Sequence, residues 1–391
     1  MERVSQSPTD PAFVQDPYPF YDRLRPLGLL AWWAEYGMPV AASHAVVSSL
    51  LRDRRFGRED PALPIRPAHQ AAFWAVEDHS MLELEPPRHT RLRGQVLRAF
   101  TSRRIAALEA GIEALAHELI DGFPLSGTVD LLDAFARPFP VRVIARLLGV
   151  PEADAPRLLR WSNRMVGMYQ AGRDHAAEVA AAEAARDFAD YVEGVLAAPA
   201  AEGLLADLLH VEREGGLSRQ ELVATVILLL NAGHEATVHT IGNGVAGLLR
   251  AGLWGTPVSP ALVEEVLRHD PPLHLFTRFA LEDADAFGHR FHRGERVGLL
   301  LAAANRDPGA FAEPARFDPD RFSPARSPAA PAQASFGAGL HFCLGTPLAR
   351  MELHAALGAL ADRRPSLRLA EPARYAPIYH FHGHDGLMVE G

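Results

Sequence analysis

The chain has 391 residues, of which 48% are hydrophobic and 22% are charged, and its formal net charge is −9. A chain of this length and composition can bury a large core, and its negative charge argues against a nucleic-acid backbone as partner. The single cysteine excludes an intramolecular disulfide, which is typical of a protein in a reducing cytoplasm.

The N-terminus has neither the apolar region of a signal peptide nor a membrane anchor. The longest apolar run, residues 222–230, is far shorter than the roughly 20 residues that span a bilayer. Two short stretches rich in proline and alanine, residues 197–202 and 323–333, are predicted to be loops rather than linkers. We therefore expect one soluble, cytoplasmic domain over residues 1–391.

A single long buried helix is predicted over residues 218–252. Ser218 and Glu221 have the spacing of a capping box, and Gly252 is a typical helix end. His234, Glu235 and His239 resemble the zinc motif HExxH, but the second histidine comes five residues after the first instead of four. Five residues rotate a helix by about 140° from the starting face, so the two imidazoles are not expected to share a zinc ion.

A second helix is predicted around Glu265 and Arg268. At a spacing of three residues these side chains are neighbours and can form a charge-assisted bidentate bond. An isolated pair of this kind is common and is usually a surface ion pair of little stability. Here the sequences AANRDP, residues 303–308, and FDPDRF, residues 317–322, follow it, which makes the pattern more specific.

The most informative segment is FGAGLHFCLG, residues 336–345, which contains Cys343. Thr346, Pro347 and a run of good helix formers follow, so the cysteine precedes a helix N-terminus, whose free N–H groups stabilise an anion. A free cysteine has a pKa of about 8.5 and needs such positive potential to become a thiolate. Glycines in the loop remove side chains and permit positive φ. The segment thus predicts a thiolate that binds a metal.

The pattern FGxGxHxCxG, matched at every fixed position, resembles the haem-binding loop of the cytochrome P-450 superfamily. Further matches run from about Glu85 to the C-terminus, so the resemblance covers most of the chain. It implies a mainly α fold with a small β region, in the N-terminal third and after Arg278. It also implies that haem b lies between the helix that begins at Ser218 and the helix after Pro347, with Cys343 as the axial ligand of the iron.

The resemblance assigns roles to further residues. Contacts with the haem propionates are expected from His89, Arg93, Arg278 and His341. Other haem contacts are expected from Phe336, Gly337, Gly339, Gly345, Ala232 and Gly233. In the family the paired glutamate and arginine lock to a later arginine and brace the thiolate loop, a structural role that falls here on Glu265, Arg268 and Arg321.

On the distal helix the family has the pattern AGxE/DT, in which an acid and an alcohol handle protons. The acid is present as Glu235, but Ala236 stands in place of the alcohol. Thr237 is turned away by about 100°, whereas Thr240 is on the same face about 6 Å further along the axis. We hypothesise that protons reach bound dioxygen through Glu235 with ordered water, a substrate hydroxyl or Thr240.

The reaction implied is monooxygenation, in which one oxygen atom of O₂ enters a substrate by hydroxylation, epoxidation or oxidative dealkylation. Electrons are expected from NAD(P)H through a ferredoxin or flavodoxin-type donor and its reductase, as in the soluble bacterial type. The acidic donor is expected to be attracted by basic residues near the cysteine, namely Arg98, Arg103, Arg104 and Arg350.

A lipophilic substrate is expected, because the segments that resemble the family's pocket are mostly aromatic or aliphatic. The predicted pocket residues are Phe73, Trp74, Met168, Leu229, Ala232, His274, Leu275, Phe276, Tyr379 and Phe381. The alternating histidines His380, His382 and His384 either bind a metal or form a turn at the pocket mouth.

Two other functions stay open. A peroxygenase, which uses hydrogen peroxide in place of O₂ and electrons, is compatible with Ala236. A non-catalytic haem sensor or carrier would have no reason to retain Glu235.

Overall fold

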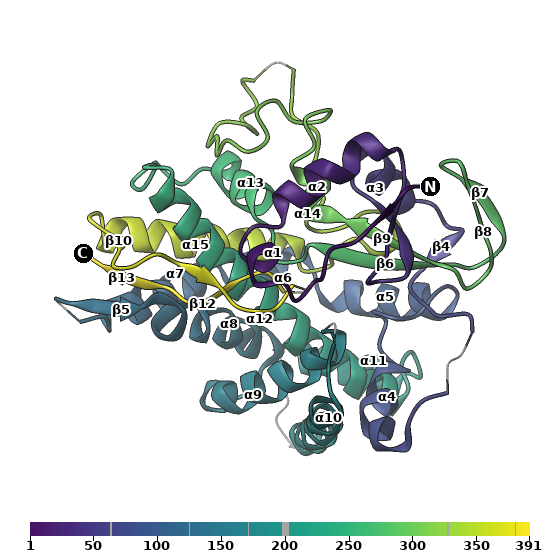
Figure 1. Ribbon diagram of the computed structural model, residues 1–391. Coiled ribbons are helices and arrows are strands. Elements are labelled where there is room, and N and C mark those ends of the chain that lie inside the picture. The colour runs from purple at the N-terminus through teal and green to yellow at the C-terminus, as the bar shows by residue number, and fades with distance from the viewer. Residues whose placement is uncertain (63–64, 125, 171, 198–202, 327, 380) are drawn as a thin grey trace.

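The computed structural model describes residues 1–62, 65–124, 126–170, 172–197, 203–326, 328–379 and 381–391 (Figure 1). As predicted, the fold is mainly helical. The α-helices are α1 Pro11–Gln15, α2 Tyr18–Leu24, α3 His44–Leu50, α4 Ala71–Glu77, α5 Arg88–Ala99, α6 Ser102–Ala107, α7 Glu109–Asp121, α8 Pro138–Leu148, α9 Ala155–Val166, α10 His175–Leu196, α11 Gly203–Arg213, α12 Arg219–Arg250, α13 Pro260–His269, α14 Leu301–Asn305 and α15 Thr346–Arg363.

Short helical turns and strands complete the chain. The turns are η1 Arg25–Leu27, η2 Ala68–Gln70, η3 Leu132–Ala136, η4 Glu152–Asp154, η5 Gly167–Tyr169 and η6 Gly339–His341. The strands are β1 Arg3–Val4, β2 Ala31–Trp33, β3 Met38–Ala41, β4 Phe56–Gly57, β5 Thr128–Asp130, β6 Leu275–Ala280, β7 Ala284–Ala286, β8 His289–Phe291, β9 Arg296–Leu300, β10 Arg368–Leu369, β11 Arg374–Tyr375, β12 His384–Gly386 and β13 Met388–Glu390.

The β structure lies at two sides of the helical body (Figure 1). A six-stranded sheet has the order β1-β2-β3-β9-β6-β4, so it joins the N-terminal segment to the strands that follow α13, as predicted. Strands β10, β13 and β5 form a second sheet near the C-terminus, which the sequence did not predict. Its strands have only two or three residues each, too few for a visible alternation of apolar and polar side chains.

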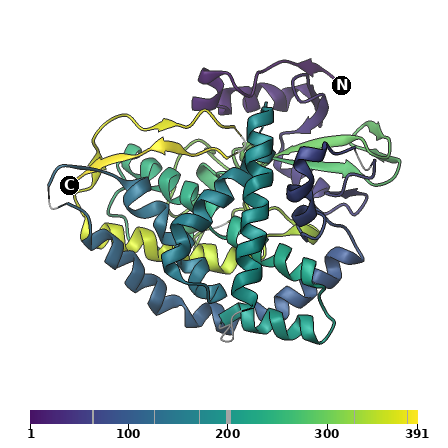
Figure 2. The same ribbon diagram turned by 90° about the horizontal axis from the view of Figure 1, so that it is seen from below.

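Helix α12 is the central element of the largest hydrophobic cluster. The predicted capping box is present, with Ser218 and Glu221 each bonded to the other's backbone N–H. This helix is long and apolar enough to cross a bilayer, but 61% of its most apolar window is buried, so it is a core helix. It packs against α8, α9, α10 and α15. Figure 2, which views the molecule from below, shows α10 lying lengthwise across that face.

The predicted loop at residues 323–333 is a loop in its described part. Residues 198–202 of the other predicted loop lie outside the described residues.

Candidate active site

The loop of residues 336–345 is closed by its own hydrogen bonds. The N–H of Cys343 donates to the carbonyl of Phe336 at 3.0 Å, and the Thr346 hydroxyl donates to the carbonyl of Cys343 at 2.8 Å. Helix α15 begins at Thr346 with a proline in its first turn, as expected for a cysteine that directly precedes a helix.

The glycines of this loop have different roles. Gly337 and Gly339 have positive φ angles of 65° and 70°, as predicted. A Cβ atom on Gly339 would lie 2.3 Å from the carbonyl oxygen of Leu51, so the loop passes directly over the end of α3. Gly345 differs from them, since its φ is −75° and its Cβ would make only an ordinary contact of 3.8 Å with Cys343 Sγ.

The Cys343 side chain is accessible to solvent. Desolvation nevertheless raises the pKa of its thiol, and this outweighs the N–H groups of Gly345 and Thr346, the Thr346 hydroxyl and the charge of Arg93, which lower the pKa. The stabilising groups that we expected are therefore present, but they do not produce a thiolate by themselves. A metal ion that coordinates a thiol deprotonates it outright.

Behind the loop lies a buried ion-pair network. Glu265 and Arg268 of α13 have no exposed surface, and two bonds of 2.7 Å join the guanidinium to the carboxylate. Arg321 donates from Nε to the same carboxylate at 3.0 and 3.2 Å. Both arginines also donate to backbone carbonyls between residues 305 and 316. All three residues predicted to act together do meet.

A buried asparagine joins this network to the cysteine loop. The carbonyl of Asn305 accepts from Arg268, while its side chain accepts from the N–H of Ala334 at 2.7 Å and donates to the Ser335 hydroxyl at 2.8 Å. That hydroxyl donates to the carbonyl of Leu267 in α13. The residues immediately before Phe336 are thus tied to α13 from two directions.

Two of the predicted propionate contacts stack on each other. The rings of His89 in α5 and His341 in the cysteine loop are 4.4 Å apart, and His341 Nε2 lies 2.8 Å from a carboxylate oxygen of Glu85. His89 is 1% exposed and its Nδ1 has no hydrogen-bond partner. Desolvation, together with the charges of His341 and Arg93, lowers the pKa of His89 to about 4.

The other two predicted contacts are arginines. Arg93 donates from Nη2 to the carbonyl of Phe342 at 2.7 Å, next to the cysteine. Arg278 in β6 is 2% exposed and forms no salt bridge within the described residues. Desolvation, together with the charge of Arg58, lowers the pKa of Arg278 to about 9. A buried cation without an anion is unfavourable, so this position favours an anionic ligand.

On α12 the small residues face different neighbours. Ala232 is exposed although Leu230 and His234 beside it are buried, so it faces accessible space. Gly233 instead faces α8, because a Cβ atom there would lie 2.8 Å from Ile144. The close approach to Ile144 shows that Gly233 allows α12 and α8 to pack tightly, and the haem contact expected of this residue stays a prediction.

The two threonines of α12 are both buried. The Thr240 hydroxyl donates to the carbonyl of Ala236 at 2.7 Å, so it is held to the face that we predicted, one turn beyond Ala236. Thr237 is 7% exposed. A hydroxyl is thus bound to the backbone of Ala236, the residue at which the pattern has its alcohol.

Glu235 lies between two imidazoles. His239 Nε2 is 3.4 Å from one carboxylate oxygen and His234 Nε2 is 3.6 Å from the other. In the orientation that satisfies its amide, Asn163 of α9 donates to Glu235 at 3.0 Å. Burial alone would raise the pKa of Glu235, but the bond from His239 and the charges of His234, His239 and Arg137 hold it below its ordinary value. The residue is a carboxylate at neutral pH.

His239 also contacts the C-terminal segment. A Cβ atom on Gly383 would lie 1.9 Å from His239 Nδ1, and the ring of Phe381 is 6.2 Å from the imidazole. The sequence did not indicate His239 as a site residue, because its only recognisable pattern was the zinc motif that the spacing excludes.

Comparison with known proteins decides the family. A model of the family "Cytochrome P450" matches residues 256–363. Cytochrome P450 CYP107DY1 of Priestia megaterium is 35% identical over 352 residues, which cover 85% of this chain and 83% of the relative. The chain belongs to the cytochrome P450 family.

Solved structures agree with this assignment. The crystal structure of CalO2 matches this P450 with a TM-score of 0.88 at 32% identity, covering 99% of this chain and 98% of that one. The structure of P450BioI in complex with an acyl carrier protein ligated to hexadec-9Z-enoic acid matches with a TM-score of 0.87 at 33% identity, covering 97% and 99%. The protein is therefore a haem monooxygenase in general terms, as predicted.

The residues of this P450 fit the family's cofactor. Haem carries two propionates and an iron that accepts a thiolate. The unpaired Arg278, the free Nδ1 of His89 and the accessible thiol of Cys343 are the donor set that such a group requires. Arg58 was missed by sequence reasoning, although its charge acts on both Arg278 and His341. Arg58 precedes the first match to the family, which is why no pattern indicated it.

The predicted substrate pocket of this P450 is only partly supported. Ala232 is exposed, and Trp74, Phe276 and Phe381 are partly exposed. His274 has no exposed surface and bonds to Tyr21, so it cannot touch a substrate here, contrary to our prediction. The remaining predicted lining residues are at most 8% exposed and pack in the hydrophobic core, where aromatic and aliphatic side chains are ordinarily found. They are Phe73, Met168, Leu229, Leu275 and Tyr379.

Proposed function

We propose that this P450 inserts one oxygen atom from O₂ into a lipophilic small molecule, with electrons from a small iron–sulfur or flavin protein. Bound haem supplies the iron that activates O₂, and ligation by a thiolate increases the electron density that favours O–O cleavage. Cys343 would hold the iron, and His89, Arg93, Arg278 and His341 would hold the propionates. The observation that carries the proposal is the hydrogen-bonded carboxylate of Glu235 on the distal helix.

Glu235 is suited to relay protons from solvent. His239 is 16% exposed in its side chain and lies 3.4 Å from the carboxylate, so it can take a proton from water and pass it to Glu235. Thr240 donates its own hydrogen to Ala236, which leaves its oxygen free to accept a hydrogen bond from a water molecule on the same helix face. A sensor or carrier has no need of such a relay.

Substituting Ala236 by Thr tests this route. We measure product formed per NAD(P)H consumed in the reconstituted system. A large drop in coupling supports the relay through Glu235 and Thr240, since an added hydroxyl would reorder the water at that face. A large gain argues instead that the alanine is a defect. Turnover with peroxide alone that equals turnover with a redox partner identifies a peroxygenase and contradicts the proposal.

The donor would dock on the cysteine side of α5. Leu97 and Phe342 are among the few large apolar side chains that are well exposed, at 47% and 40%. Arg93, one helical turn before Leu97, bonds to the carbonyl of Phe342, so the two lie in neighbouring segments. Arg98 and Arg103 are exposed beside them and form no salt bridge within the described chain. An apolar centre flanked by cations suits an acidic protein.

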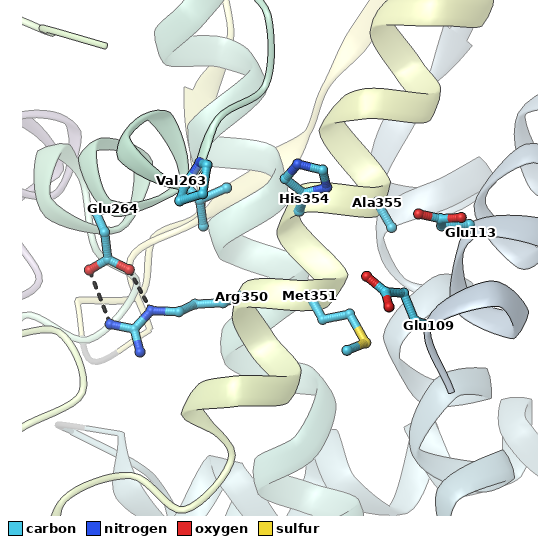
Figure 3. A pocket seen from close by; sticks show the side chains of 9 residues that line it. Glu109, Glu113, Val263, Glu264, Arg350, Met351, His354 and Ala355 are labelled. Carbon is cyan, nitrogen blue, oxygen red and sulfur yellow. Dashed lines mark hydrogen bonds and ion pairs between the residues drawn. The ribbon is translucent and has the colours of Figure 1, made fainter. Parts of the chain in front are cut away.

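The other two predicted docking arginines are already neutralised. Arg350 of α15 is bound to Glu264 of α13, in a pocket that Glu109 and Glu113 also line (Figure 3). Arg104 pairs with Asp207 at 2.5 Å. We therefore assign docking to Arg98 and Arg103. Reversing both charges is expected to slow reduction of the haem by an acidic ferredoxin several-fold at low salt. An unchanged rate would contradict the assignment, and reversing Arg350 serves as the control.

The substrate would be apolar, because Ala232 of α12, Phe381 beside His239 and Phe276 beside Gly337 of the cysteine loop are all at least partly accessible. A similar structure holds a fatty acyl group on an acyl carrier protein, so free and carrier-bound lipids are both tested. The screen follows shifts of the ferric absorption band, and the carbon monoxide spectrum of the reduced protein establishes thiolate ligation. A spectrum that no ligand moves, with no turnover, would indicate a sensor or carrier.

A further inference from the structure

A buried polar cluster lies between the two ends of the chain, away from Cys343 in sequence and in contacts. Asp270 follows the last residue of α13, His274 immediately precedes β6, and His382 belongs to the segment before β12. Their exposed fractions are 6%, 0% and 1%. None of the three is used by the proposed reaction.

The ligand atoms of the three side chains converge. His274 Nε2 lies 3.8 Å and His382 Nδ1 lies 3.5 Å from the same oxygen, Oδ1 of Asp270, and all three atoms are within 4.8 Å of one another. Zinc bonds of about 2.0–2.2 Å in a tetrahedral site separate neighbouring ligand atoms by about 3.3–3.6 Å. A small contraction would bring the three atoms to that spacing.

A backbone carbonyl fixes the tautomer of His382, the histidine nearer to the carboxylate. His382 Nε2 is 2.9 Å from the carbonyl of Val14, and a carbonyl only accepts, so Nε2 carries the hydrogen. In the neutral ring Nδ1 is then an acceptor, and it faces a carboxylate oxygen. Histidines that bind metals characteristically donate their other N–H to a carbonyl in this way.

The facing nitrogens are left without partners. His274 bonds through Nδ1 to the Tyr21 hydroxyl at 2.8 Å, whereas its Nε2 and His382 Nδ1 are buried and make no hydrogen bond. Asp270 is held as an anion, since the hydroxyls of Tyr18 and Tyr375 donate to it at 2.7 and 2.5 Å. Two imidazole nitrogens without a hydrogen bond thus face one carboxylate in a buried site, which is a favourable setting for a cation.

Imidazole nitrogens select transition metals over Mg²⁺ and Ca²⁺, which prefer oxygen ligands. A buried site with two imidazoles and one carboxylate therefore suits zinc better than either of those ions.

We propose that Asp270, His274 and His382 bind one Zn²⁺ ion as a structural site. The ion would join α13 to the C-terminal segment, and through Val14, Tyr18 and Tyr21 to the N-terminal helices. It would also fix the isolated bridge between Leu273 and Phe381, which brings the Phe381 ring near His239 on the distal helix. The site is thus connected to the distal helix through the segment that carries Phe381.

The chain contains its own control. His69, His175 and Glu178 also have ligand atoms within 4.8 Å of one another, but they lie at the surface. His69 Nε2 is already bonded to Glu178 at 2.8 Å, so that group needs no ion to satisfy it. His69→Gln therefore disrupts the surface group without touching the buried one.

The experiment measures zinc per polypeptide by equilibrium dialysis of the holoenzyme after treatment with a chelator. His274→Gln and His382→Gln are each expected to lose one tightly bound equivalent, while His69→Gln retains it. Zinc should raise the temperature of unfolding in the wild type and in His69→Gln but not in the other two. Equal zinc content in all proteins, or loss only in His69→Gln, would overturn the proposal.

Crystals of the wild type grown with zinc provide a test that does not depend on variants that fold. Anomalous scattering at the zinc edge is expected to give a peak about 2.0–2.2 Å from the three ligand atoms. A peak only at His69 and His175, or no peak at all, would show that the buried cluster is a proton-linked hydrogen-bond network and not a metal site.

Discussion

Two carboxylates, Glu265 behind the cysteine loop and Glu235 on the distal helix, are hydrogen-bonded in different ways. Glu265 is bonded by two arginines and a backbone N–H, and the arginines in turn fill the carbonyls around them. Glu235 instead has imidazoles at 3.4 and 3.6 Å, and the facing nitrogen of His234 has no hydrogen bond. The network around Glu265 has a fixed shape because its polar groups are all hydrogen-bonded. Glu235, by contrast, has imidazole partners that can gain or lose a proton, as expected of a group that exchanges protons.

The largest effect on haem content is expected from a substitution in the Glu265 network. Glu265→Gln removes the anion between Arg268 and Arg321 and leaves two buried cations together, which costs about 3–5 kcal/mol. We expect the haem content of the purified protein to fall roughly tenfold or more, measured as haem per polypeptide. Glu264→Gln is the matched control, because its side chain pairs with the exposed Arg350. Full haem content in Glu265→Gln would show that the network does not brace the loop.

Glu235→Gln is expected to have the opposite profile. Haem content and the carbon monoxide spectrum should be normal, because the carboxylate bonds only to groups on the distal side. Product formation should fall about tenfold to a hundredfold, since a positioned acid or base contributes at least that much. Glu214→Gln, at the exposed end of α11, is the control. If Glu235→Gln lost its haem, as Glu265→Gln is expected to, the distinction between these two carboxylates would be contradicted.

A third carboxylate, Glu77 of α4, sharpens the comparison through pH. It is 8% exposed, and desolvation raises its pKa to about 7, although the Tyr169 hydroxyl donates to it at 3.0 Å. Because the folded pKa exceeds the unfolded one, stability falls as the pH rises from about 4.5 to 7. Glu77→Gln is therefore expected to match the wild type below that window and to be more stable above it.

The gain above pH 7 should be on the order of 3 kcal/mol, measured by urea unfolding across the pH series. The exposed Glu113→Gln should show no such divergence. If the free energies of unfolding of the wild type and Glu77→Gln changed in parallel with pH, ionisation of the Glu77 carboxyl would not destabilise the fold, and the prediction would be contradicted.

The smallest effect concerns the glycines of the loop. Gly339→Ala must accept a positive φ and a clash with Leu51, so we expect a loss of about 1–3 kcal/mol and weaker haem retention. Gly345→Ala should change either quantity little, because its backbone is helical and its Cβ meets only Cys343 Sγ at 3.8 Å. Chemical unfolding measures the stability, and the rate of haem transfer to a haem-binding acceptor protein measures haem retention. Equal losses in the two variants would contradict the difference that we draw between them.

The sequence predicted those parts of the site that depend on local spacing. The capping box of α12, the pair of Glu265 and Arg268, and the position of Cys343 before α15 are all set within a few residues. Contacts between distant segments were not predicted. Nothing near Gly233 indicates that Ile144 lies against it, and nothing near His274 indicates Tyr21.

The same limit explains the errors on the pocket. Aromatic and aliphatic residues line pockets and fill cores alike, so Phe73 and Tyr379 could not be assigned to either from their type. Arg58 and His239 acquire their roles only because chain segments far apart in the sequence bring Arg278 and Glu235 beside them.

Gly383 has a practical consequence for anyone who wishes to redirect the enzyme by random mutagenesis. A Cβ atom at that position would lie 1.9 Å from an imidazole nitrogen of the distal helix, so any larger side chain there must displace the ring of His239. Phe381, two residues earlier, is partly exposed to solvent and is the better target for mutagenesis. Screening effort in the C-terminal segment is therefore best spent on Phe381.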